Sequence, residues 1–113
     1  MPKPIMIKAK GDGLKIQLAV WEGKGKQILC IHGLTANSRF WDCLASALSP
    51  HHRVIAMDLR GRGLSDKPPT GYSIEHHCKD VLALMNDQGL ERPVLMGHSL
   101  GAFISLVFSA KYP

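Results

Sequence analysis

The order of apolar and polar residues along the chain predicts two strands near its start. Residues 14–20 alternate between apolar and polar side chains, which is typical of a strand with one buried face, and a shorter strand is indicated at 5–9. Turn sequences at Gly11-Asp12-Gly13 and at 23–26 bound the second strand. Because so tight a turn joins the two strands, we expect them to pair antiparallel.

Three later stretches are apolar without interruption, at 28–31, 54–57 and 93–96. Strands that are apolar on both faces belong in a parallel sheet with helices on both sides. This part of the chain therefore predicts a mostly parallel sheet, extended by the antiparallel strands that precede it.

Helical spacing of apolar residues fills the intervals between these strands. We expect one helix capped by Ser38 and running to Leu48, a second capped by Ser73 and stopped by Gly89, and a third over about 99–111. Because strand and helix alternate, the fold class is α/β, and the length fits one domain over residues 1–113.

Composition and charge narrow the classes of function. The chain has 113 residues, 45% hydrophobic and 20% charged, which argues against disorder. Fourteen Lys and Arg against nine Asp and Glu give a net charge of +5, but the basic residues are scattered, so we expect no nucleic-acid partner. No apolar stretch is long enough for a membrane span or a secretory leader, so we expect no membrane association. Three widely spaced cysteines form no disulfide framework, which favours a cytoplasmic location.

One pentapeptide carries candidate chemistry. Gly97-His98-Ser99-Leu100-Gly101 is a G-x-S-x-G pattern between a buried strand and a predicted helix. In this context it indicates a nucleophilic Ser99 on a sharp, strained turn that glycines leave uncrowded. The N–H groups that open the next helix favour the negative charge that develops in acyl transfer. The plainer alternative is a strand-to-helix turn in which Ser99 is an N-cap.

A second glycine turn, His32-Gly33-Leu34, follows the apolar strand at 28–31. An oxyanion hole needs one backbone N–H from such a loop and one from the residue after the nucleophile. We therefore expect Leu34 and Leu100 to supply these two N–H groups. We expect His32 to hold the loop in shape rather than to act as a base.

The third motif is Asp58-x-Arg60-Gly61-x-Gly63-x-Ser65. It lacks the third glycine of a dinucleotide fingerprint and the chain has no P-loop, so we expect no nucleotide or other cofactor. Together with His32-Gly33 and the G-x-S-x-G pattern, in this order, it resembles the α/β-hydrolase superfamily, closest to esterase-like and C–C-bond-hydrolase-like members. The resemblance covers nearly the whole chain, from about residue 14 onward.

The resemblance implies a serine hydrolase that acts on a small-molecule ester or related carbonyl substrate through an acyl-enzyme. It disfavours the haloalkane dehalogenase and epoxide hydrolase branches, which use Asp where this chain has Ser99. The triad of this fold continues with Asp or Glu and then His, but the residues after Ser99 contain none of these. We therefore expect residues 1–113 to be the N-terminal part of a single α/β-hydrolase domain, truncated after the helix that follows the nucleophile. We expect the chain alone to be inactive or feeble.

Other histidines are poor replacements for the missing base. We expect them at the surface and out of hydrogen-bond reach of Ser99, with the neighbouring His98 pointing elsewhere. No metal site is expected either, because Glu75-His76-His77-Cys78 lacks the spacing of metal ligands. The histidines expected at the surface are His51, His52, His76 and His77.

Truncation predicts an exposed sheet edge. The strand over 94–96 loses a neighbour, and Phe103, Leu106 and Val107 of the following helix lose part of their cover. We expect marginal stability or self-association through this edge. The alternative to an enzyme is an inactive fragment or interaction partner that pairs through the same edge.

Overall fold

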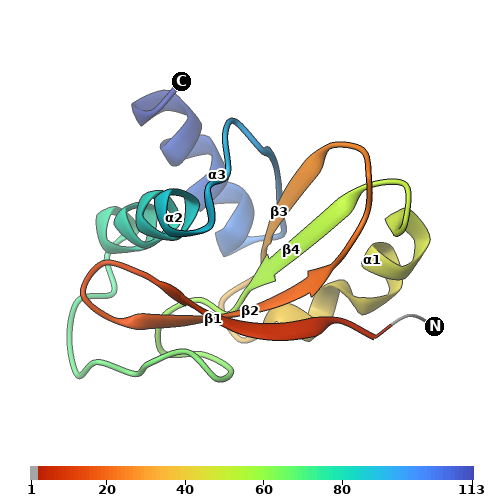
Figure 1. Cartoon of the computed structure of the whole chain (residues 1–113). Coiled ribbons are helices and arrows are strands. Elements are labelled where there is room, and N and C mark those ends of the chain that lie inside the picture. The colour runs from red at the N-terminus through yellow and green to blue at the C-terminus, as the bar shows by residue number, and fades with distance from the viewer. Residues whose placement is uncertain (1–2) are drawn as a thin grey trace.

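The computed structural model describes residues 3–113, which form one five-stranded sheet with helices on both faces (Figure 1). The strand order is β1-β2-β4-β3-β5. In chain order the elements are β1 (Ile5–Lys10), β2 (Lys15–Trp21), β3 (Gln27–Ile31), the 3₁₀-helix η1 (Ser38–Trp41), α1 (Asp42–Leu48), β4 (Arg53–Met57), α2 (Ile74–Gln88), β5 (Val94–Gly97) and α3 (Leu100–Lys111).

The sheet is antiparallel at one side and parallel at the other. β1 and β2 form the expected antiparallel hairpin, with Ile5 opposite Val20 and Lys10 opposite Lys15. β2 also pairs antiparallel with β4, whereas β3 lies between β4 and β5 and is parallel to both. The predicted α/β class and mostly parallel arrangement of the apolar strands are confirmed.

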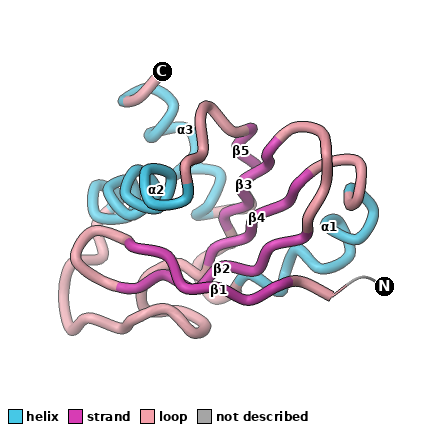
Figure 2. Tube along the Cα trace, viewed as in Figure 1, coloured by secondary structure: helices cyan, strands magenta, loops and turns pink. Residues whose placement is uncertain are grey.

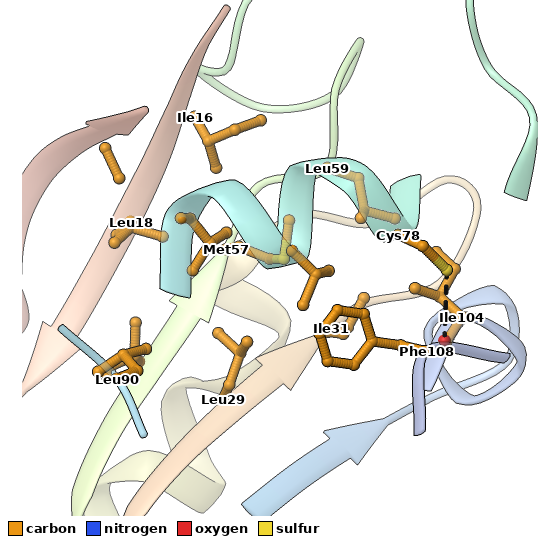
Figure 3. Close-up of a cluster of buried hydrophobic side chains, with 14 of the residues drawn as sticks. Ile16, Leu18, Leu29, Ile31, Met57, Leu59, Cys78, Leu90, Ile104 and Phe108 are labelled. Carbon is orange, nitrogen blue, oxygen red and sulfur yellow. Dashed lines mark hydrogen bonds between the residues drawn. The ribbon is translucent and has the colours of Figure 1, made fainter. Parts of the chain in front are cut away.

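The helices lie on both faces of the sheet, with α2 and α3 on one side and α1 on the other (Figure 2). A hydrophobic cluster holds them on each face. The larger lies under α2 and α3, where Cys78, Ile104 and Phe108 meet strand residues such as Leu29 and Ile31 (Figure 3). The smaller lies under η1 and α1, around Trp41 and Ala45. The covered sheet thus fixes the carboxyl ends of β3, β4 and β5 at one edge, where the loops with candidate chemistry begin.

One strand is more deeply buried than its alternating sequence predicts. Every residue of β2 after Lys15 is buried, including the polar Gln17. The Gln17 amide donates to the carbonyl oxygens of Ile7 and Leu18, at 2.9 and 3.1 Å. Because both N–H donors of the amide have acceptors, the polar Gln17 side chain can be buried on the face of β2 that the sequence predicts to be exposed.

The first helix begins differently from the prediction. Asn37, not Ser38, is the cap: its side-chain oxygen accepts the Arg39 N–H at 2.9 Å, and a 3₁₀ turn precedes α1. Ser38 is instead buried, and its backbone N–H donates to Asp58 Oδ1 at 2.6 Å. The second helix is as predicted, because Ser73 accepts the His76 N–H and Gly89 ends α2 in the left-handed conformation.

The placement of His77 at the surface is wrong, because His77 is only 1% exposed. It belongs to the inward stripe of α2, together with Cys78, Asp80, Val81 and Leu84, which follows the helical period. Two polar side chains, those of His77 and Asp80, thus lie within a stripe that otherwise serves as core.

β5 is exposed along one side, as the sequence predicts. Among residues 3–113 it pairs with β3 only, and Val94 is 43% exposed. On α3, Phe103 and Leu106 are also exposed, at 53% and 70%. None of the helices in the described part of the chain has the length and apolar character that a bilayer crossing requires.

Candidate active site

Ser99 lies on the turn that joins β5 to α3. Its backbone has φ 56° and ψ −117°, a left-handed conformation that residues other than glycine rarely adopt, and that costs on the order of 1–3 kcal/mol. The Ser99 side chain is exposed and makes no capping hydrogen bond to α3. Ser99 thus occupies the N-cap position of α3, and its carbonyl accepts the N–H groups of Ala102 and Phe103, but its side chain has no capping role.

The two glycines of the motif are required by close backbone approaches. A Cβ on Gly101 would overlap the carbonyl oxygen of Ile31, at the end of β3. A Cβ on Gly97 would lie 2.5 Å from the backbone nitrogen of Ala102, in the first turn of α3. Since these contacts are with backbone atoms, no side-chain movement relieves them, and only glycine lets the strand end and the helix start so close together.

The loop after β3 packs directly against this turn. The His98 N–H donates to the Ile31 carbonyl at 3.1 Å, and a Cβ built on Gly33 would lie 3.3 Å from Ser99 Cβ. Leu34 follows Gly33 and is 60% exposed. The structure thus brings the Leu34 loop beside Ser99, with Leu100 as its chain neighbour.

Two backbone N–H groups near Ser99 are suited to an anion. Leu100 is the first residue of α3, so no carbonyl of the helix can accept its N–H. The Leu34 N–H belongs to the peptide whose carbonyl, that of Gly33, lies 2.6 Å from His32 Nδ1. Hydrogen bonding at that carbonyl fixes the peptide plane, and with it the direction of the Leu34 N–H.

His32 is fully buried and uses both ring nitrogens. Its Nε2 accepts the Leu59 N–H at 2.9 Å, so Nδ1 carries the proton and donates to the Gly33 carbonyl. Burial lowers the pKa of His32, against smaller opposing effects of the Gly33 carbonyl and Asp58. A neutral imidazole engaged on both sides holds its loop, as the sequence predicts, and has no free nitrogen for proton transfer to Ser99.

The Asp58–Ser65 segment makes hydrogen bonds that hold the loop after β3 and its own turn in place. The Asp58 carboxylate accepts the N–H groups of Ser38 and Leu64, at 2.6 and 2.9 Å. Ser65 Oγ donates to the Asp58 carbonyl at 2.6 Å and accepts the Gln17 N–H at 2.8 Å. These motif residues therefore act by fixing loops, a role that sequence reasoning did not assign to them.

A buried ion pair anchors this segment to α2. Arg60 Nε and Nη2 donate to the two Asp80 carboxylate oxygens at 2.7 and 2.8 Å, and Nη1 donates to the Gly71 carbonyl at 2.7 Å. Arg60 is 4% exposed and Asp80 fully buried, and the carboxylate raises the pKa of Arg60. Sequence reasoning missed this pair, although an aspartate within the apolar stripe of α2 was a cue for a buried cationic partner.

The remaining histidines do not converge on Ser99. The His98 ring stacks against Phe40, with centroids 4.8 Å apart, and His77 is buried with its Nδ1 unpartnered among the described residues. A hollow of about 470 Å³ lies at the start of β5, lined by residues such as Leu95 and Tyr112, and does not include Ser99. Within residues 3–113, no three His, Cys, Asp or Glu side chains are grouped to hold a metal ion.

Comparison with known proteins gives the family. A model of the alpha/beta hydrolase fold matches residues 26–113. The chain belongs to the alpha/beta hydrolase fold family. A 2-(acetamidomethylene)succinate hydrolase of Mesorhizobium japonicum is 43% identical over 108 residues, which are 95% of this chain and 39% of that protein.

Solved structures of this family confirm the fold. A crystal structure of E-2-(acetamidomethylene)succinate hydrolase superposes with a TM-score of 0.91 at 36% identity, over 97% of this chain and 41% of that one. An epoxide hydrolase from Vigna radiata superposes with a TM-score of 0.90 at 28% identity, over 96% of this chain and 36% of that one. The chain thus spans well under half the length of the alpha/beta hydrolases it matches.

Proposed function

We propose that this chain carries the nucleophile and the oxyanion-binding loop of a serine hydrolase. Ser99 Oγ attacks the carbonyl carbon of a small ester or related substrate, and the tetrahedral intermediate expels the leaving group to give an acyl-enzyme. Water then cleaves the bond between the acyl group and Ser99 Oγ, which releases the acid and restores the serine. The observation that carries the proposal is the positive φ of Ser99, which holds an exposed hydroxyl on a strained turn without any capping role. Strain of this kind is retained where a side chain must project in one direction.

The oxyanion of the tetrahedral intermediate would be held by the N–H groups of Leu34 and Leu100. Support comes from the contact of Gly33 with Ser99 and from the position of Leu100 at the start of α3. Fixed N–H donors at the place where charge develops commonly contribute 10²–10³-fold in rate each, because they need no rearrangement during the reaction.

The base and its acidic partner would come from polypeptide outside these 113 residues. No Asp, Glu or His follows Ser99, and His32 and His77 are buried away from the solvent that reaches it. Without a base, the residual activity of such a site is small. We accordingly expect this chain alone to acylate slowly and to depend on an added base.

The serine favours acyl transfer over epoxide opening. In the family resemblance, the epoxide hydrolase branch carries Asp at the position of Ser99. The Mesorhizobium relative, by its name, hydrolyses 2-(acetamidomethylene)succinate, and we extend to this chain only the general class of hydrolysis at a carbonyl carbon, since loops outside the matched part also shape specificity.

The test is acetylation of Ser99 by p-nitrophenyl acetate, with imidazole added as the external base. The modified residue is located by mass spectrometry of peptides. We expect Ser99 to be acetylated faster as imidazole is added, with no acetylation of that peptide in Ser99→Ala. The matched control is Ser109→Ala, which removes an exposed serine from α3, the helix that follows Ser99. Equal labelling of Ser99 and Ser109 would contradict the proposal.

A second candidate function is binding through the open side of β5. The exposed Val94, Phe103 and Leu106 support it, because an apolar edge strand is a template for pairing with another chain. This candidate predicts an inactive fragment or interaction partner. Stoichiometric binding to a full-length hydrolase, with no acetylation of Ser99, would favour it over catalysis.

We also propose a cytoplasmic location. Cys30, Cys43 and Cys78 are free thiols, and burial raises the pKa of Cys30 to about 12, so that this thiol stays protonated and inert. Three unpaired thiols suit a reducing compartment. Recovery of the protein in the soluble fraction of cells, without export, is the expected result of fractionation.

A further inference from the structure

The loop that carries Leu34 is held by one neighbouring segment at its start, middle and end. The Leu59 N–H donates to His32 Nε2 at 2.9 Å, and the Ser38 N–H donates to the Asp58 carboxylate at 2.6 Å. Between these two contacts, Arg62 Nε donates to the carbonyl oxygen of Leu34 at 3.1 Å. Residues 58–62 therefore form a brace for the loop at 32–38.

The Arg62 contact is the one closest to the proposed chemistry. Leu34 lies in a turn, outside any helix or strand, and its side chain is largely exposed. The peptide before Leu34 is fixed by the bond between His32 and the Gly33 carbonyl. The peptide after Leu34 is fixed by Arg62. Both backbone torsions of Leu34 are therefore restrained, the first by a bond within the loop and the second by the guanidinium of Arg62 alone.

Arg62 is itself held in one orientation. Its Nη1 donates to the Arg60 carbonyl at 2.9 Å, and its guanidinium lies over the Tyr72 ring, 5.9 Å from the centroid. Arg60 in turn is tied to α2 through the buried pair with Asp80. Arg62 thus holds the Leu34 carbonyl, and Arg62 is itself bound to the backbone of Arg60, whose side chain is anchored to the buried Asp80 of α2.

We propose that Arg62 is a positioning residue for the oxyanion site, which keeps the Leu34 N–H directed at the space above Ser99. The proposal rests on the function proposed above. Arg62 binds the carbonyl of the peptide that follows Leu34, whereas the N–H of Leu34 lies on the preceding peptide, which His32 holds. Loss of Arg62 therefore leaves the donor and its bond to His32 in place but removes the second restraint on Leu34, so the N–H moves over a wider range of directions. Because removal of a whole donor costs 10²–10³-fold, a partly disordered donor should cost about tenfold in the rate of Ser99 acylation.

The first measurement uses the chain itself and needs no catalysis. Backbone ¹⁵N relaxation gives the order parameter of the Leu34 N–H in the unsubstituted chain, in Arg62→Met and in Arg62→Lys. We expect the order parameter of Leu34 to fall in Arg62→Met and to recover partly in Arg62→Lys, since a lysine offers the cation but not the fork. The matched control is Arg39→Met, which removes an exposed arginine whose side chain, within residues 3–113, pairs with Asp42 alone.

The second measurement is the rate of Ser99 acetylation by p-nitrophenyl acetate with added imidazole, in the same variants. We expect about a tenfold lower rate for Arg62→Met, a partial return for Arg62→Lys and no change for Arg39→Met. An unchanged Leu34 order parameter in Arg62→Met overturns the proposal. So does a normal acetylation rate in a variant whose Leu34 has become mobile.

The two possible failures are distinguishable. If the unsubstituted chain does not acetylate Ser99 at all, the proposed function fails, and the positioning role fails with it. If the unsubstituted chain reacts and Arg62→Met reacts equally fast, only the role of Arg62 is refuted. Urea unfolding of each variant shows whether a slower rate comes from a folded population.

Discussion

Acid should destabilise this protein through His77. The side chain is 1% exposed on the inward face of α2, and its Nδ1 has no hydrogen-bond partner among the described residues. Burial is the main cause that lowers the pKa of His77 from 6.5 to about 4. The positive charges of Arg62 and Arg60 act in the same direction, and Asp80 opposes them.

The sign and size of the effect follow from proton linkage. Above pH 6.5 His77 is neutral in both the folded and the unfolded chain, and pH has no effect through it. As the pH falls from 6.5 to about 4, the unfolded chain binds a proton at this residue and the folded chain does not. Since one pKa unit corresponds to about 1.4 kcal/mol, the free energy of unfolding should fall by about 3 kcal/mol over this interval.

The assay is urea unfolding at several pH values from 7.5 to 4, followed by the fluorescence of Trp21 and Trp41, which both lie in the core. The unsubstituted chain is compared with His77→Leu, which cannot bind the proton. His32 is also buried with a lowered pKa, but it is present in both proteins, so its effect cancels in their difference.

The stability difference between the unsubstituted chain and His77→Leu should shift by about 3 kcal/mol between pH 7.5 and 4, in favour of the variant at low pH. The control is His51→Leu, which removes an exposed histidine and should show no such shift. The same pH dependence in the unsubstituted chain and His77→Leu would refute the reasoning.

Three further predictions concern strain, the buried ion pair and the open edge. Ser99→Gly should raise the free energy of unfolding by about 1 kcal/mol, because glycine accepts the positive φ, whereas Ser99→Ala keeps the strain; equal stabilities in urea would refute this. Asp80→Asn should lower the free energy of unfolding by about 3–5 kcal/mol, since it leaves the Arg60 guanidinium buried without its counter-charge, and a loss below about 1 kcal/mol would argue against it. The unsubstituted chain should self-associate in sedimentation velocity, and Leu106→Lys should self-associate less, because it places a charge on the exposed apolar face beside β5; a stable monomer of the unsubstituted chain contradicts this.

The parts of the fold that the sequence predicts are those with local causes. Continuous apolar stretches mark β3 and β4 because these strands are covered on both faces, and Ser73 and Gly89 bound α2 through bonds within a few residues. The turn at Ser99 is likewise local, since the glycines that permit it are its near neighbours in the chain.

The parts that escaped prediction depend on contacts between distant residues. Ser38 is not the cap because the helical turn begins one residue earlier, after Asn37, and the N–H of Ser38 is bound by Asp58, twenty residues away. The burial of His77 and the pairing of Arg60 with Asp80 depend on how α2 is rotated on the sheet. The helical period places His77 and Asp80 in the inward stripe of α2, but it does not show which distant residue, here Arg60, pairs with the aspartate.

The most direct test of Ser99 as the nucleophile of a hydrolase is turnover in a completed fold. Residues 1–113 joined to the part of the Mesorhizobium 2-(acetamidomethylene)succinate hydrolase that they do not match would form such a fold. The expected result is multiple turnover of p-nitrophenyl acetate that falls at least 10³-fold in Ser99→Ala. A chimera that unfolds cooperatively yet turns over nothing, or that is equally active as Ser99→Ala, would contradict the assignment of Ser99.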